Sequence, residues 1–162
     1  MNRKFNILTI VFQLVSTFIL TLGVYLIYAL LDSDFGFDGL VGLLIFQPLL
    51  GTVISILTIF VCLIVGLPIR LDKRINKWWA DNFHIPIIGT GCGLIFLFLA
   101  TLPYFTETVS TDINGQQTFK QIPNSFLSYT GWVLTAFMTL HIFPPDNLVN
   151  WIKKMVLPFK TS

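Results

Sequence analysis

The residue types best suited to chemistry in this chain are two cysteines and two histidines: Cys62, Cys92, His84 and His141. Sets of Cys and His side chains bind zinc or copper when they converge on one point. These four come from separate segments, and no pair has the i, i+4 spacing that presents two ligands on one helix face. Cysteine is also often buried simply as a small hydrophobic side chain. We therefore predict no metal site and no cofactor, and the roles of these four residues stay open.

Three acidic residues, Asp32, Asp34 and Asp38, are spaced like the start of a calcium-binding loop. The EF-hand pattern requires glycine at its sixth position and a bidentate glutamate at its twelfth. This chain has Phe37 and Leu43 at those positions. The pattern therefore indicates an acidic turn outside the membrane rather than a calcium site.

Three glycines lie in the segment Gly89-Thr-Gly-Cys-Gly93, a density also found in dinucleotide-binding loops. No strand precedes them and the surrounding residues are apolar, which such a loop does not allow. Gly89 and Gly93 instead form a GxxxG pair, and Ala100 extends the same face, so we expect a second helix to pack closely there. No Gly-x-Ser-x-Gly or Ser/His/Asp arrangement is present. We predict no catalytic residue, and the protein is expected not to be an enzyme.

The composition predicts what kind of structural element contains these residues. Of 162 residues, 54% are hydrophobic and 11% charged, whereas about a quarter are charged in a soluble domain. Apolar segments of membrane-spanning length lie at about 5–31, 40–67, 85–104 and 125–143, and none contains Asp, Glu, Lys or Arg. The sequence predicts an all-α integral membrane protein, a four-transmembrane-helix bundle forming one membrane domain over 1–162. The lack of charge within the spans disfavours proton-coupled transport and charged-filter channels.

The segment at about 70–83 is basic and has apolar residues on one helical face, which is typical of a helix lying flat at the membrane surface. A second such segment is predicted at about 146–156. Either segment could bind anionic lipid or serve only to set topology, and the sequence leaves these alternatives open. The residues expected at the lipid headgroups are Arg70, Lys73, Arg74, Lys77, Trp78, Trp79, Trp151, Lys153 and Lys154.

Asn114 and Gly115 lie between two β-prone runs at 106–113 and 116–122. An Asn-Gly pair in this position predicts a short external β-hairpin, because both turn residues need positive φ. An isolated hairpin is marginally stable in water, so we expect it to lean on the bundle or on a partner. Asn114, Gly115 and Phe119 are the candidate residues for binding an external partner.

The distribution of positive charge predicts the orientation. With both termini in the cytoplasm, nine of the ten Lys and Arg residues are cytoplasmic, and only Lys120 is outside. We therefore expect a multi-pass protein of the cell (inner) membrane.

In architecture the chain resembles the small four-span immunity proteins that protect bacteria from pore-forming toxins. They are similar in length, keep both termini inside and have a basic middle loop. The leading hypothesis is a non-enzymatic membrane protein that binds another membrane protein or itself, as an accessory subunit or immunity-type protein. One alternative is a homo-oligomeric pore or small-solute channel, lined by the hydroxyls of the fourth span with Gln13 and Gln47. Another is a lipid-handling or redox membrane enzyme that uses Cys62, Cys92 or His141. The expected partners are the lipid bilayer and a membrane protein, with no nucleic acid.

Overall fold

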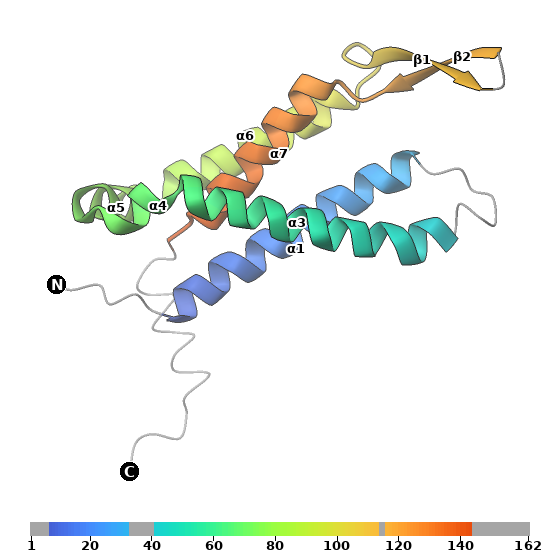
Figure 1. Ribbon diagram of the computed structural model, residues 1–162. Helices are drawn as coiled ribbons and strands as arrows, with labels where there is room; N and C mark the ends of the chain where they lie inside the picture. Colours follow the sequence, from blue (N-terminus) through green and yellow to red (C-terminus); the bar gives the residue numbers. More distant parts are fainter. Residues whose placement is uncertain (1–6, 33–40, 114–115, 144–162) are drawn as a thin grey trace.

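The computed structural model describes residues 7–32, 41–113 and 116–143 (Figure 1). The predicted segment at 146–156, with Trp151, Lys153 and Lys154, lies outside the described residues. The same is true of the hairpin turn, Asn114 and Gly115.

The described chain is mostly helical, with one small antiparallel sheet of two strands. This outcome confirms the helical character of the protein and the predicted hairpin. The elements in chain order are α1 (Ile7–Asp32), the π-helix η1 (Gly42–Phe46), α3 (Gln47–Val65), α4 (Leu67–Leu71), α5 (Lys73–Asp81), α6 (His84–Ala100), β1 (Glu107–Ile113), β2 (Gln116–Ile122) and α7 (Ser125–Leu140).

Two helical stretches, Thr9–Leu31 and Gly42–Val65, are each long and apolar enough to cross a membrane. A third crossing is possible if α5 and α6 form one span, bent by 73° at the break between them. Helices α6 and α7 have 17 and 16 residues. At 1.5 Å per residue these are about 26 and 24 Å long, below the roughly 30 Å of a bilayer hydrocarbon core. The helices α6 and α7 are therefore shorter than the apolar segments from which the third and fourth spans were predicted.

Local residues explain where the helices start and stop. Pro48 lies in the first turn of α3, where its missing N–H is tolerated, and the π-helix η1 ends just before it. Asp72 has an extended backbone, and its carboxylate accepts hydrogen bonds from the N–H groups of Arg74 and Ile75 at 2.7 and 3.1 Å. This N-cap separates α4 from α5, so the amphipathic segment expected at 70–83 contains the last two residues of α4 and the whole of α5.

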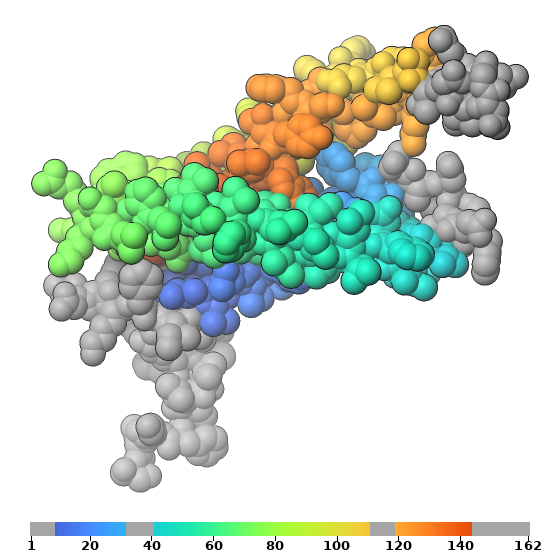
Figure 2. All heavy atoms as spheres, viewed as in Figure 1, coloured from blue at the N-terminus to red at the C-terminus, as the bar shows by residue number. Residues whose placement is uncertain are grey.

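The long helices form two pairs, α1 with α3 and α6 with α7, and α7 also contacts both α1 and α3. The short helices α4 and α5 lie at one end of the bundle, and the β-hairpin extends from the other (Figure 1). In the space-filling view, α3 lies along α1, with α7 beside them (Figure 2).

The α6–α7 pair is close because glycines face each other. A Cβ on Gly131 would lie 2.7 Å from the Gly93 carbonyl oxygen and 2.9 Å from the Leu97 nitrogen, closer than real Cβ atoms approach. A Cβ on Gly89 would lie 2.6 Å from Cγ of Met138. Ala100 is fully buried. The three residues expected to pack against another helix thus all lie in buried or crowded positions, and α7 is the helix that contacts Gly89 and Gly93.

The surface of the bundle is more apolar than that of a soluble protein, and several polar side chains are buried inside. Large apolar side chains are exposed on the long helices; Leu44, Leu49 and Phe60, for example, are each more than half exposed. Polar side chains are buried: Gln13, Thr17, Thr21, Ser55, Thr135, Thr139 and His141. A helix bundle surrounded by lipid is expected to have such a surface, because lipid does not penalise exposed apolar side chains and polar groups face the interior.

Candidate functional site

A set of hydrogen bonds joins α1, α4, α5 and the end of α7 where the short helices meet the bundle. We call it the polar junction; its side chains are those of Gln13, Arg70, Trp79 and His141. Arg70 Nη2 donates to Gln13 Oε1 at 3.0 Å and to the Leu140 carbonyl at 3.1 Å. Gln13 Nε2 donates to the Ile142 carbonyl at 2.8 Å. The carbonyls that α7 leaves free at its C-terminus are thereby satisfied by side chains from other helices.

Arg70 is half-buried in this junction. Burial lowers the pKa of Arg70 below its ordinary value, because desolvation disfavours the charged guanidinium. The guanidinium nevertheless stays protonated at physiological pH. Its two acceptors are neutral oxygens of Gln13 and Leu140, so the charge is held by hydrogen bonds within the protein.

His141 is fully buried beside the junction. Its Nδ1 lies 2.7 Å from the Phe137 carbonyl oxygen, which can only accept, so Nδ1 carries the proton. The ring packs against Phe137 with centroids 4.5 Å apart, and Trp79 Nε1 donates to the His141 carbonyl at 2.8 Å. A side chain at Gly66 would overlap the imidazole. The surroundings of His141 are those of a packed structural residue.

No group of three or more His, Cys, Asp or Glu residues that could hold a metal occurs within the part of the chain that the structure describes. Cys62 is buried in an apolar cluster with Ile59, Ala136 and Leu140. Cys92 and His84 are exposed on α6. Cys62, Cys92, His84 and His141 do not form a shared site among the described residues.

The structure divides the residues expected at the lipid headgroups into two groups. Arg70 and Trp79 point inward and hydrogen-bond within the protein. Lys73, Arg74 and Lys77 are exposed, and so is Trp78 at 52% of its surface. Of the expected headgroup residues that the structure describes, Lys73, Arg74, Lys77 and Trp78 are the ones exposed for contact with a membrane surface.

The β-hairpin is attached to the start of α7 through Glu107. Its carboxylate accepts from Asn124 Nδ2 at 2.9 Å, from Ser125 Oγ at 2.9 Å and from the Ser125 N–H at 3.3 Å. Asn124 is also the N-cap of α7, and its N–H donates to the Ala100 carbonyl at 3.0 Å. A carboxylate at a helix N-terminus is favoured by the helix dipole. The first residue of β1 is thus fixed to the ends of both α6 and α7.

Phe119 lies on the opposite face of the hairpin from this attachment. In the register of the two strands, Glu107 pairs with Ile122 and Ser110 pairs with Phe119. Because side chains alternate between faces along a strand, Glu107 and Phe119 point to opposite sides. Phe119 is 70% exposed. The hairpin therefore presents an aromatic side chain away from the helix that holds it.

More exposed aromatic residues surround the base of the hairpin. Tyr104 follows α6 and is 95% exposed, while Phe126 and Tyr129 of α7 are each 74% exposed. Phe126 and Tyr129 are three residues apart and therefore share one side of the first turns of α7. Rings in this position suit either a membrane–water interface or a protein contact.

The hydroxyls of α7 proposed to line a pore are divided between the surface, where Tyr129 is exposed, and the inside of the bundle. Thr135 and Thr139 are buried, and Thr139 Oγ1 is 3.2 Å from Thr90 Oγ1 of α6. Both amide atoms of Gln13 are used in the polar junction. Gln47 Oε1 accepts from the Tyr25 hydroxyl at 2.7 Å. Thr139, Gln13 and Gln47 therefore bond to other parts of the same chain, whereas the buried Thr135 hydroxyl has no hydrogen-bond partner among the described residues.

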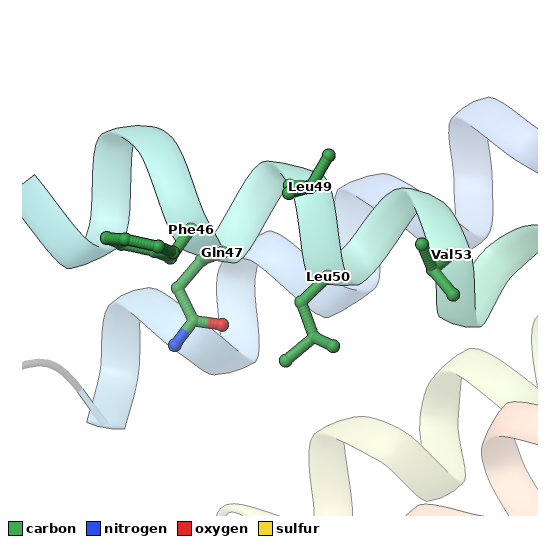
Figure 3. A pocket seen from close by; sticks show the side chains of 5 residues that line it. All are labelled: Phe46, Gln47, Leu49, Leu50 and Val53. Carbon is green, nitrogen blue, oxygen red and sulfur yellow. The ribbon is translucent and has the colours of Figure 1, made fainter.

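A shallow apolar groove of about 300 Å³ lies on η1 and the start of α3 (Figure 3). Its lining residues are Phe46, Gln47, Leu49, Leu50 and Val53. Gln47 and Leu50 point to one side of the helix and Leu49 to the other (Figure 3). The lining has no titratable group, so the groove suits hydrocarbon contact rather than chemistry.

Sequence reasoning did not identify Glu107, Gly66 or the inward role of Arg70. Gln13 is the only strongly polar residue within its span, and such a residue must find a partner inside the bundle. Arg70 follows the second apolar segment closely, so it was within reach of Gln13. The sequence shows that Gln13 needs a partner and that Arg70 follows the second apolar segment, but it does not show that the two side chains meet.

The chain matches no known family model, no curated protein and no solved structure.

Proposed function

We propose that this chain is a non-enzymatic, multi-pass protein of the cell membrane that acts by binding another membrane protein or a second copy of itself. The contact is made at the hairpin end of the bundle. The observation that carries the proposal is the anchored hairpin, with Phe119 exposed on the face opposite Glu107. An accessory subunit and an immunity-type protein are both proteins of this kind.

The membrane setting is supported by the surface of the bundle. Two helices are long and apolar enough to span, and the exposed side chains of the helices are largely apolar. We propose four spans with both termini in the cytoplasm. In that arrangement α4 and α5 lie at the cytoplasmic surface, and the hairpin lies outside.

The hairpin is suited to binding because its position is fixed. Two strands without further support are marginally stable, and here Glu107 ties β1 to the start of α7. A preorganised surface loses less conformational entropy when it binds a partner. The sheet has two strands, so each also has a free edge to which another strand can pair.

The homo-oligomeric pore remains the alternative. The buried positions of Thr135, Thr139 and Gln13 favour it less, because Thr139 and Gln13 bond within one chain and all three side chains are enclosed by it. Flux of small solutes into liposomes that contain the purified protein would support a pore.

Photo-crosslinking in living cells tests the proposal. A photoreactive phenylalanine analogue is placed at Phe119, and the matched control carries it at Val133, which is 56% exposed in the middle of α7. We expect a protein adduct of defined mass from position 119 and none from 133. An adduct of twice the chain mass indicates self-association, and any other defined mass indicates a different protein. Absence of adducts from 119, 126 and 129, together with a monomer in mild detergent, would overturn the proposal.

A further inference from the structure

A second surface lies at the opposite end of the bundle, on the outward side of α5 (Lys73–Asp81). At about 100° per residue, this nine-residue helix divides into three sides. Asn76, Trp79 and Ala80 face the protein: Ala80 is buried, Trp79 donates to the His141 carbonyl, and Asn76 Nδ2 donates to the Ile69 carbonyl at 3.1 Å. The inward side fixes the rotation of α5 and therefore fixes where its other two sides point.

The other two sides of α5 are both exposed but differ in chemistry. Ile75 and Trp78 form an apolar side and are 39% and 52% exposed. Lys73, Arg74 and Lys77 form a basic side. Their side chains form no hydrogen bond or ion pair with any residue that the structure describes, and the acid nearest to them on this side, Asp81, is itself exposed.

The direction of α5 relates these sides to a membrane. Helices α5 and α6 meet at an angle of 73°. When α6 runs across the bilayer, α5 lies close to the plane of its surface. With their side of α5 turned toward the bilayer, Ile75 and Trp78 reach the apolar layer, and the neighbouring basic side lies at the depth of the headgroups.

We infer that Lys73, Arg74 and Lys77 bind the phosphate-bearing headgroups of anionic phospholipids. The charges are complementary, and the exposed apolar side next to them needs contact with acyl chains, which a soluble anion cannot provide. Each Lys or Arg near an anionic surface contributes attraction of about 1 kcal/mol, or roughly fivefold in affinity. Arg70 is not part of this surface, because its guanidinium bonds to Gln13 and Leu140. The inference depends on membrane insertion and is independent of any partner at the hairpin.

Lipid retention by the full-length protein tests this site. The protein is placed in nanodiscs that contain equal amounts of phosphatidylglycerol and phosphatidylcholine, and lipids retained after release are counted by native mass spectrometry. Nanodiscs expose both bilayer faces, so any effect of these residues on insertion orientation does not enter the result. We expect wild-type protein to retain phosphatidylglycerol over phosphatidylcholine at least about fivefold, and the variant K73Q/R74Q/K77Q to retain both about equally.

The control variant K73R/R74K/K77R keeps the three charges and should keep the wild-type preference. Equal preference in wild type and in K73Q/R74Q/K77Q, with unchanged helical circular dichroism, would overturn the inference. If the neutralised variant does not fold, lipid retention by wild-type protein is measured at 0.5 M salt, where screening should remove most of the preference for phosphatidylglycerol. A preference that persists at this salt concentration would contradict the inference. Displacement of the lipid by an equal concentration of inorganic phosphate would show that the site binds free phosphate, and this result would also overturn the inference.

Discussion

The amide of Gln13 joins three segments that are far apart in the sequence. It accepts from Arg70, 57 residues later, and donates to the Ile142 carbonyl, 129 residues later. Thr17, one turn along α1, is equally buried, but its hydroxyl bonds only to the Gln13 carbonyl of its own helix. The Gln13 side chain thus connects α1 to other segments, whereas the Thr17 hydroxyl bonds within α1.

Replacing Gln13 by leucine removes both bonds and leaves the Arg70 guanidinium with one fewer acceptor. We expect the Q13L variant to be less stable by about 1–3 kcal/mol, since buried polar groups lose their partners. Reversible unfolding in mixed detergent and SDS micelles measures the change. The matched variant T17V should lose less than about 1 kcal/mol, and an equal loss in both variants would contradict the role given to Gln13.

Glycine positions 91 and 93 on α6 provide a second comparison between single residues. A Cβ at Gly93 would overlap Thr135 and approach the Gly131 carbonyl oxygen at 2.9 Å, whereas a Cβ at Gly91 meets nothing within 4 Å among the described atoms. We expect Gly93→Ala to destabilise the protein by about 1–3 kcal/mol through overpacking. Gly91→Ala should be neutral or stabilising in the same unfolding assay, because alanine favours helix. Similar losses at both positions would show that α6 and α7 do not pack as described.

At the scale of elements, the side chain of Glu107 attaches the hairpin to the start of α7. Glu107 receives hydrogen bonds from Asn124 and Ser125, whereas the neighbouring Thr108 is exposed. Loss of this attachment should free the strands without unfolding the helices, since the helices are held by their own packing.

We therefore expect Glu107→Ala to raise amide hydrogen exchange in β1 and β2 by roughly tenfold, which corresponds to about 1.4 kcal/mol. Exchange in α1 and α3 should be unchanged. Hydrogen–deuterium exchange with mass spectrometry in detergent micelles gives both values. Thr108→Ala is the control, and a hairpin equally protected in wild type and E107A would show that Glu107 does not hold it.

Patterns local in sequence predicted the elements well. The Asn114-Gly115 turn, with β-prone runs on either side, predicted the hairpin, and β1 and β2 confirm it. The break at Asp72 was not predicted, although its signal is local, since an aspartate before a helical run is a common N-cap. The inward turn of Arg70 could not be predicted, because a basic residue after a span is usually a topology determinant. Only its contacts with Gln13 and Leu140 distinguish it from Lys73, Arg74 and Lys77.

At the scale of the whole molecule, the main prediction concerns sidedness. The short helices and the hairpin lie at opposite ends of the bundle (Figure 1). Single cysteines are introduced by K77C and F119C in a chain whose own cysteines are replaced by alanine. A membrane-impermeant maleimide added to intact cells should label residue 119 and should label residue 77 only after the membrane is opened. Labelling of both positions in intact cells would contradict the proposed topology.

The number of spans was harder to predict than their presence. Apolar length identified the two helices that are long enough to cross, Thr9–Leu31 and Gly42–Val65. It overestimated the helical length of the third and fourth, because residues 101–104 lie beyond α6 and residues 141–143 lie beyond α7. Hydropathy reports which residues tolerate lipid and does not report where backbone hydrogen bonding ends.

The bonds of Arg70 also bear on how the protein is made. Arg70 donates to the Leu140 carbonyl of α7, and Gln13 donates to the Ile142 carbonyl. Both carbonyls leave the ribosome long after α1, α3 and α4 have been synthesised. Until translation reaches that point, the early helices carry a guanidinium and an amide without their final partners. A nascent chain halted before α7 would keep the bond between Arg70 and Gln13 but would lack both carbonyl acceptors. Complete hydrogen bonding of these two early side chains thus depends on the arrival of the last helix.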